Sequence, residues 1–199
     1  IIATGADPKW IGVAGEKELL GKGVSSCATC DGAFFKEKDV IVVGGGDTAM
    51  EDSTFLTHFA KSVTVVHRRE EFRASKVMQE RAKSNPKIKF LFNTEVKEIK
   101  GTDKVNSVQL FDNKTNETSE FPIDGVFVAI GHIPNSMVLE GIETDEEGYI
   151  KIVDHYKTNI NGVFVAGDVH DRHYKQAVTA AGYGCAAALE AERWLSSQK

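Results

Sequence analysis

Blocks of apolar and polar residues alternate along the chain, and their periods predict strands and helices in turn. Short, nearly continuous apolar runs at residues 39–43, 63–66 and 126–130 are typical of parallel strands that are buried on both faces. Residues 47–61 carry apolar side chains at helical spacing, and residues 69–84 show an amphipathic helical pattern that stops before an Asn-Pro pair. The first part of the chain therefore predicts a unit in which strands and helices alternate.

The pattern changes after residue 88 to short runs in which apolar and polar side chains alternate. Turn residues separate these runs, which lie at 89–92, 95–100, 105–111 and 118–122. An antiparallel meander attached to a parallel sheet fits this pattern. The chain closes with a strand and turn at 163–168 and a long alanine-rich helix at 176–196, which we expect to lie mostly in the core.

Composition argues against several classes of protein. The 199 residues include 24 Lys and Arg against 29 Asp and Glu, a formal net charge of −5. This acidic balance argues against a nucleic-acid surface, which needs a basic stripe. No apolar run approaches the ~20 residues of a membrane helix, so no membrane contact is expected. Only three cysteines are present, which favours a reducing compartment, the cytoplasm, over secretion.

The opening residues, 1–6, have the pattern of a buried strand that ends in a turn, and no initiator methionine precedes them. We therefore expect the chain to begin inside a domain of a longer protein.

A glycine-rich turn, Gly44-Gly45-Gly46-Asp47-Thr48-Ala49, joins the strand at 39–43 to the following helix. In this Gly-x-Gly-x-x-Ala form, the first glycine makes the turn and the second lets the backbone approach a pyrophosphate. The small third residue permits close packing of helix on strand, and the helix N-terminus offers free N–H groups. A tight turn without a ligand is the plainer interpretation, but the flanking elements favour a Rossmann-like dinucleotide site.

A basic cluster follows the second strand, at the position where NAD-binding folds place an acidic residue on the ribose. The sequence there is His67-Arg68-Arg69, with Arg73 expected one turn into the next helix. Guanidinium groups match a 2′-phosphate, which an acidic residue would repel. A solvated helix start is the alternative, yet cations at a helix N-terminus oppose its dipole. The cluster therefore predicts a preference for NADP(H) over NAD(H).

Two cysteines lie close together in Cys27-Ala28-Thr29-Cys30-Asp31-Gly32. A two-residue gap suits an exchangeable redox disulfide. Two unlinked core cysteines and half of a zinc site are alternatives, although no second Cys pair or His pair completes a metal site. Asp31 could move the proton that thiol–disulfide exchange requires, or it could cap a helix. Cys185, on the last helix, is expected to be a buried, inert thiol.

Together these motifs resemble the low-molecular-weight thioredoxin reductases, a family of flavin- and pyridine-nucleotide-dependent disulfide reductases. The resemblance runs through nearly the whole chain. Besides the motifs above, it rests on Ala3-Thr4-Gly5-Ala6, on Gly131-His132-Ile133-Pro134-Asn135, and on Gly167-Asp168 followed by Gln176-Ala177. It implies an α/β fold in which an FAD-binding domain is split in sequence by an inserted, Rossmann-like three-layer NADP(H)-binding domain with an antiparallel meander.

On this resemblance, residues 12–130 form the NADP(H)-binding domain with the redox cysteines. Residues 1–11 end the first segment of the FAD domain, whose earlier part is absent, and residues 131–199 form its C-terminal segment. The resemblance also implies a homodimer and a rotation of the inserted domain, for which Gly131 to Pro134 lies where a hinge strand would be.

The same resemblance implies a thioredoxin-disulfide reductase in which electrons pass from NADPH through FAD to the disulfide and on to thioredoxin. Cys30 would face the flavin, Cys27 would attack the partner, and Asp31 would be the acid–base residue. The cofactor-binding residues implied are Gly44, Gly45, Gly46, Asp47, Thr48, Ala49, His67, Arg68, Arg69, Arg73 and Ile130 for NADPH, and Gly167, Asp168, Lys175, Gln176 and Ala177 for FAD. Lys175 stands where the family often has Arg, which would weaken a forked contact to the flavin.

Other functions stay open at this point. The flavoprotein component of an alkyl hydroperoxide reductase has a similar redox pair, but that family usually has Pro-His where this chain has Ala28-Thr29. The 199 residues could also act only as a non-catalytic nucleotide-binding module. A small zinc-bound interaction domain is the remaining alternative.

Overall fold

The computed structural model describes residues 1–137 and 139–198, and these divide into two compact units. The central unit is Lys9–Gly131, and the terminal unit combines Ile1–Pro8 with His132–Lys199. The chain therefore passes between the units twice, at Pro8 and again at Gly131.

The central unit is built on a five-stranded parallel sheet with the strand order β2-β9-β3-β4-β5. These strands are β2 (Val24–Ser25), β9 (Gly125–Ala129), β3 (Asp39–Gly44), β4 (Ser62–Val66) and β5 (Ile88–Leu91). Along β3, Val40 and Val42 pack into one core cluster and Ile41 into another. Both faces of the sheet are thus buried, as the nearly continuous apolar runs predict.

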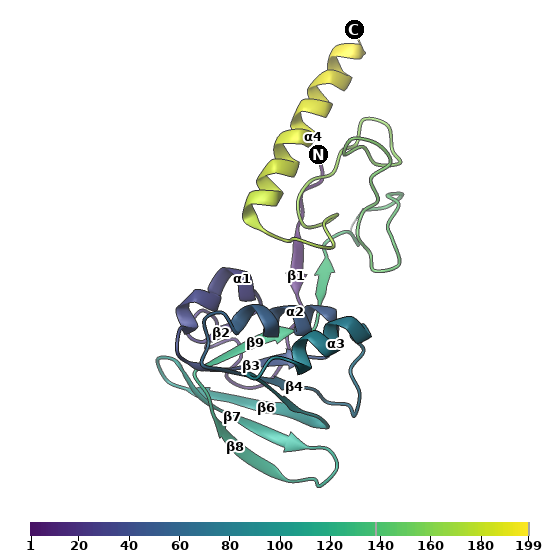
Figure 1. Ribbon diagram of the computed structural model, residues 1–199. Coiled ribbons are helices and arrows are strands. Elements are labelled where there is room, and N and C mark those ends of the chain that lie inside the picture. The colour runs from purple at the N-terminus through teal and green to yellow at the C-terminus, as the bar shows by residue number, and fades with distance from the viewer. Residues whose placement is uncertain (138, 199) are drawn as a thin grey trace. The chain divides into compact units, whose positions relative to one another are not determined.

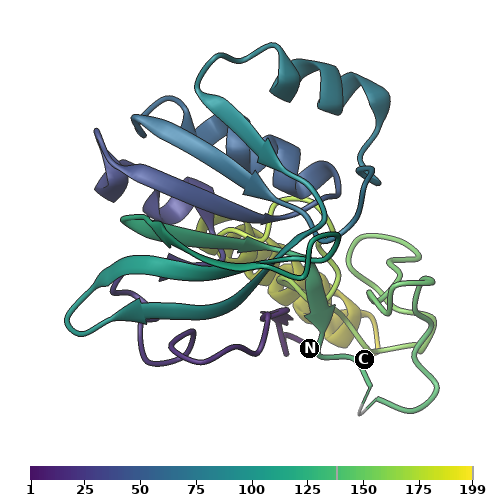
Figure 2. The same ribbon diagram turned by 90° about the horizontal axis from the view of Figure 1, so that it is seen from below.

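Helices cover one face of this sheet and antiparallel strands cover the other (Figure 1). The helical elements are α1 (Ala28–Asp31), the 3-10 turn η1 (Gly32–Phe35), α2 (Asp47–Leu56) and α3 (Lys76–Lys83). The opposite layer is the meander β6 (Thr94–Gly101), β7 (Val105–Asp112) and β8 (Thr118–Pro122), the side from which Figure 2 views the unit. The predicted α/β fold with three layers and an antiparallel meander is confirmed.

One strand belongs to a different sheet from the one predicted. The run at 89–92 was expected to open the meander, but β5 pairs in parallel with β4, with Val63 opposite Ile88 and Val66 opposite Leu91. Because β5 is the edge strand of the parallel sheet, Lys89 is exposed on it. Its apolar residues therefore alternate with a polar one, as in an antiparallel strand.

The terminal unit contains the antiparallel pair β1 (Ala6–Pro8) and β10 (His132–Pro134), and the long helix α4 (Ala177–Ser197). The strand predicted at 163–168 is reduced to isolated bridges. Val165 bridges Ile2 and Phe164 bridges Lys157. Because each partner segment supplies a single residue here, the ladder does not extend.

Helix α4 is more exposed than its alanine-rich composition predicts. Ala187 is its one fully buried residue among those described, and it packs in a cluster with Phe164 and Ala166. Only this face of α4 has a packing partner in the part of the chain that the structure describes. Cys185 is exposed, so the prediction of a buried thiol is wrong here. Ile1 is also exposed rather than part of a buried strand.

Among residues 1–137 and 139–198, no helix combines the length and apolar character needed to cross a bilayer.

Candidate active site

Cys27 and Cys30 are joined by a disulfide bond at the start of α1. Cys27 is the N-cap residue of this short helix, and its Sγ accepts a hydrogen bond from the Cys30 backbone N–H at 3.1 Å. The Thr29 hydroxyl lies 3.4 Å from the same sulfur. Cys30 is exposed and Cys27 half-buried. An accessible disulfide with polar hydrogens near one sulfur is suited to thiol exchange, because those hydrogens stabilise a thiolate.

Asp31 is held beside this disulfide by a serine that the sequence motifs did not single out. The Ser25 hydroxyl donates to Asp31 Oδ2 at 2.6 Å and accepts from the Cys27 backbone N–H at 3.0 Å. Asp31 makes no side-chain capping bond to η1, so the capping role considered from the sequence is wrong. The Ser25 bridge instead ties the carboxylate to the backbone of the cysteine loop.

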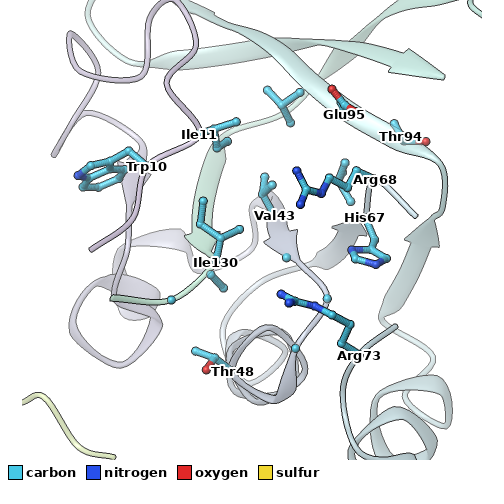
Figure 3. Close-up of a pocket in the computed structure, with 17 residues that line it drawn as sticks. Trp10, Ile11, Val43, Thr48, His67, Arg68, Arg73, Thr94, Glu95 and Ile130 are labelled. Carbon is cyan, nitrogen blue, oxygen red and sulfur yellow. The ribbon is translucent and has the colours of Figure 1, made fainter. Parts of the chain in front are cut away.

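A cavity of about 570 Å³ opens in the central unit where β3, β4 and β9 end (Figure 3). We call it the glycine-turn cavity. The predicted NADPH-binding residues that line it are Gly44, Gly45, Gly46, Thr48, His67, Arg68, Arg73 and Ile130. Asp47, Ala49 and Arg69 lie outside its lining. These residues come from three separate segments of the sequence, which the parallel strands bring together at one edge of the sheet.

The three glycines of the turn face different surroundings. A Cβ added at Gly44 would lie 2.4 Å from the Ala129 carbonyl oxygen, and one added at Gly45 would lie 2.3 Å from the His67 ring. A Cβ added at Gly46 would meet nothing within 4 Å. Gly44 and Gly45 therefore permit close packing within the protein. Only Gly46 presents bare backbone to open space, as an approaching phosphate requires.

Ala49 and Asp47, the two positions of the motif that lie outside the cavity lining, make contacts within the protein. Ala49 is fully buried, and a Cβ at Gly44 would lie 2.7 Å from the Ala49 Cβ, so the helix packs tightly on the turn. Gly46, not Asp47, is the N-cap of α2. The Asp47 carboxylate instead accepts the Ser75 backbone N–H at 2.7 Å, which ties the turn to the segment before α3.

Arg68 and Arg73 supply positive charge to the cavity, and both guanidinium groups point into it (Figure 3). His67 is only 6% exposed and packs behind the turn. Burial lowers the pKa of His67 below its ordinary value, against the hydrogen bond to the Glu71 carbonyl. His67 is therefore a wall of the site rather than a source of charge.

The helix predicted at 69–84 begins only at Lys76. The Arg73 and Ala74 backbone N–H groups donate to the Gly45 carbonyl at 2.8 and 3.1 Å, so this segment folds back over the glycine turn. The basic residues therefore lie in a loop before the helix. The prediction that these cations lie at a helix N-terminus and oppose its dipole is therefore wrong. What favours phosphate binding is that the Arg68 and Arg73 side chains point into the cavity (Figure 3).

Several lining residues were not among the predicted site residues, and they include Trp10, Ile11, Thr94 and Glu95. Trp10 and Ile11 are adjacent large apolar residues outside the predicted strands and helices, which was a usable signal. The sequence around Thr94 and Glu95 carries none, because the register of β6 places them there.

A buried carboxylate holds the apolar wall. Glu16 is 1% exposed and accepts the backbone N–H groups of Ile11 at 2.8 Å and Gly12 at 2.7 Å. Two bonds to successive amides fix the conformation of the loop that carries Trp10 and Ile11.

The residues expected to bind FAD lie in the terminal unit. Asp168 Oδ1 is buried without a hydrogen-bond partner among the described residues. Burial, with the neighbouring Asp171 carboxylate, raises the pKa of Asp168 above its ordinary value. Such an acceptor fits a hydroxyl donor from a ligand. The positive φ of Gly167, +74°, makes the turn that presents it.

Asp171, which the motif analysis did not select, shapes the approach to α4. Its carboxylate accepts the backbone N–H groups of His173, Tyr174 and Lys175 at 2.8–2.9 Å. Burial raises the pKa of Asp171, but these three hydrogen bonds outweigh that effect and bring the pKa below its ordinary value. Lys175 adopts a positive φ of 45°, and Gln176 caps α4 through a capping box with Thr179. Ala177 is the first residue of the helix.

The chain resembles known proteins over its whole length. Residues 1–184 match the family described as pyridine nucleotide-disulphide oxidoreductase. A thioredoxin reductase of Mycolicibacterium smegmatis is 56% identical over 100% of this chain and 64% of its own length. A bifunctional thioredoxin reductase/thioredoxin of Mycobacterium leprae is 52% identical over 98% of this chain and 43% of its own length. The crystal structure of a Streptococcus pyogenes thioredoxin reductase superposes with a TM-score of 0.92 at 46% identity, covering 98% of this chain and 65% of that one. The chain thus spans less than two thirds of these relatives.

Proposed function

The chain belongs to the pyridine nucleotide-disulphide oxidoreductase family, and from this premise we propose that it is the NADP(H)- and disulfide-bearing part of a thioredoxin reductase. The observation that carries this proposal is the pairing, within one compact unit, of the glycine-turn cavity with the Cys27–Cys30 disulfide. A flavoprotein component of an alkyl hydroperoxide reductase is not favoured, because Ala28 and Thr29 separate the cysteines here.

Residues of the cavity fit the two charged groups of NADPH, its pyrophosphate and its 2′-phosphate. Gly46 offers bare backbone and the first turn of α2 to the pyrophosphate, while Arg68 and Arg73 offer guanidinium groups to the 2′-phosphate. Thr48 and Ile130, which also line the cavity, would contact the same ligand, and Arg69 would contribute charge from outside the lining.

Residues of the terminal unit fit FAD, since the buried and unpartnered Asp168 Oδ1 needs a donor. A ribityl hydroxyl would provide it, with Gly167, Lys175, Gln176 and Ala177 around the same ligand. NADPH and FAD, when bound, supply the two electrons that reduce the disulfide. In domain terms we assign the central unit, Lys9–Gly131, to NADP(H) binding, because Trp10 and Ile11 line the glycine-turn cavity, and the terminal unit, Ile1–Pro8 with His132–Lys199, to FAD binding.

The chain's own residues would then carry out thiol–disulfide exchange. The Cys27 thiolate, stabilised by the Cys30 N–H, would attack one sulfur of the thioredoxin disulfide and form a mixed disulfide. The other thioredoxin sulfur would leave as a thiolate and take up a proton. Cys30 would next attack Cys27, which releases the second thioredoxin sulfur and restores the Cys27–Cys30 bond. Asp31, held by Ser25, would exchange the protons.

We further propose that the complete enzyme is a cytoplasmic homodimer in which the central unit rotates about the connections at Pro8 and Gly131. Thioredoxin as the partner is supported by the bifunctional Mycobacterium leprae protein, whose name joins a reductase to a thioredoxin.

A trapping experiment on the chain itself tests the thiol roles and the partner. Because Cys185 is exposed, all variants carry Cys185→Ser. With Cys30→Ser, Cys27 can attack oxidised thioredoxin but nothing resolves the adduct, so a mixed disulfide should accumulate on a non-reducing gel. Cys27→Ser is the matched control and should trap little. Trapping by Cys27→Ser alone would reverse the assigned roles, and trapping by neither variant would exclude thioredoxin as the partner.

A further inference from the structure

The tip of the β7–β8 hairpin, residues 112–117, contacts the loop that carries the basic cluster. Asn113 Nδ2 donates to the Arg68 carbonyl oxygen at 3.1 Å. The Asn113 backbone N–H donates to the Asn93 carbonyl at 2.7 Å, and the Asn93 N–H donates to the Arg69 carbonyl at 3.0 Å. Lys114 forms an ion pair with Glu70. The hairpin tip therefore contacts three consecutive residues of this loop: the Arg68 backbone directly, the Arg69 backbone through Asn93, and the Glu70 side chain.

This anchoring matters because the basic loop lacks regular secondary structure. Arg68 and Arg69 are exposed and lie between β4 and α3. A guanidinium at the end of a long, exposed side chain gives a defined contact only if its backbone is fixed. Asn93 adopts a left-handed φ of 51°, which asparagine tolerates, and in that conformation it joins the hairpin tip to the loop.

Asn113 also restrains a carboxylate that lines the same cavity. Its Nδ2 lies 3.1 Å from Glu95 Oε1, and Lys97 Nζ lies 2.6 Å from Glu95 Oε2. Figure 3 shows Glu95 and Arg68 on neighbouring parts of the wall. The hydrogen bonds from Lys97 and Asn113 lower the pKa of Glu95, and the Arg68 charge, which already acts on this carboxyl, helps to lower it. If Asn113 were lost, Glu95 Oε1 would be available to form a direct pair with the Arg68 guanidinium. It would then compete with a phosphate for the same donors.

We propose that Asn113 is a positioning residue that sets the preference of the glycine-turn cavity for a 2′-phosphorylated adenosine. It acts through the Arg68 backbone, which it fixes, and through Glu95, which it keeps from Arg68. This inference rests on the proposed function, because it assumes that Arg68 binds the 2′-phosphate of NADP(H).

Binding of two small probes, 2′,5′-ADP and 5′-ADP, separates this role from a structural one. Isothermal titration calorimetry on the full chain would compare the wild type with Asn113→Ala. The matched control is Asn116→Gly, a residue of the same turn whose φ of 58° glycine adopts without strain. For Asn113→Ala we expect affinity for 2′,5′-ADP to fall about fivefold to tenfold while affinity for 5′-ADP changes less than about twofold. Asn116→Gly should change neither.

Two further readouts keep the test decisive. The 31P resonance of the bound 2′-phosphate should move toward its free-ligand position in Asn113→Ala, because the guanidinium contact is loosened. Adding Glu95→Gln to Asn113→Ala should recover part of the lost affinity, since the competing charge is gone.

The outcomes distinguish this inference from the function beneath it. A wild type that binds both probes equally would refute the assignment of the 2′-phosphate site itself. A wild type that prefers 2′,5′-ADP, together with an Asn113→Ala variant of unchanged preference, would refute only the role of Asn113. Equal losses for both probes would also refute it, because they would indicate a merely structural contribution.

Discussion

Replacing Gly46 by alanine should separate ligand binding from folding at the glycine turn. The added methyl meets no atom of residues 1–137 and 139–198 within 4 Å, and the residue's φ of −96° is ordinary for alanine. The same methyl would occupy the space through which a pyrophosphate approaches the backbone. We therefore expect Gly46→Ala to fold normally and to bind NADPH poorly.

The magnitudes follow from the geometry. Substituting alanine for glycine reduces the entropy of the unfolded chain and stabilises by ~0.4–1 kcal/mol. Alanine is a poorer N-cap residue than glycine, and Gly46 is the N-cap of α2, so this gain is largely offset. For a chain of this size the melting temperature should move by less than ~4 °C. Losing one charge-assisted bond between a backbone N–H and a phosphate costs ~1.5–3 kcal/mol, about a tenfold to hundredfold loss of affinity.

The assay pairs isothermal titration with NADPH and thermal unfolding of the same preparation. Gly44→Ala is the contrasting variant, since its Cβ would lie 2.4 Å from the Ala129 oxygen and 2.7 Å from the Ala49 Cβ. It should lose ~1–3 kcal/mol of stability through overpacking. Wild-type NADPH affinity in Gly46→Ala would refute the placement of the pyrophosphate at Gly46. A melting temperature as low as that of Gly44→Ala would refute the open geometry.

Three further predictions follow from other parts of the central unit. Because Arg68 lines the cavity and Arg69 does not, Arg68→Ala should weaken NADPH binding about tenfold and Arg69→Ala should weaken it much less. NADH binding by either variant should change little. Equal losses of affinity for NADPH and NADH would contradict this prediction. Glu16→Ala leaves two backbone N–H groups without their acceptor and should destabilise by ~1–3 kcal/mol in urea unfolding, whereas Gln should retain part of that stability. Burial, reinforced by the adjacent Glu51 carboxylate, raises the pKa of Asp52 from 3.8 to about 7; the folded state therefore holds this proton more tightly than the unfolded state, and stability falls as pH rises through that range. Asp52→Asn should remove that fall and stabilise by up to ~4 kcal/mol at pH 8, and an unchanged pH dependence of urea unfolding would contradict the assignment.

The sequence predicts those parts of the fold in which the surroundings of a residue follow from its neighbours in the sequence. The runs that became β3, β4 and β9 are apolar at nearly every position because both faces of each strand are covered. The edge strand β5 was predicted in the wrong sheet. Lys89 is exposed at the sheet edge, so polar and apolar residues alternate along β5 as they do in an antiparallel strand. The burial of α4 was wrong for a related reason. Alanines favour a helix, but burial depends on partners that composition does not specify.

The candidate site likewise has a part that local sequence predicts and a part that it does not. The six residues of the glycine turn are consecutive, so the sequence alone identifies the turn. The separate role of each residue follows only from the atoms that surround it in the structure. Trp10 and Glu95 come from segments far from the glycine turn in sequence: local bonds to the Glu16 carboxylate fix one wall, and the register of β6 places the other. A motif can thus identify the class of ligand. Selectivity between related ligands depends on how firmly distant segments hold the arginines, and that is why a hairpin tip outside every motif is the place to test it.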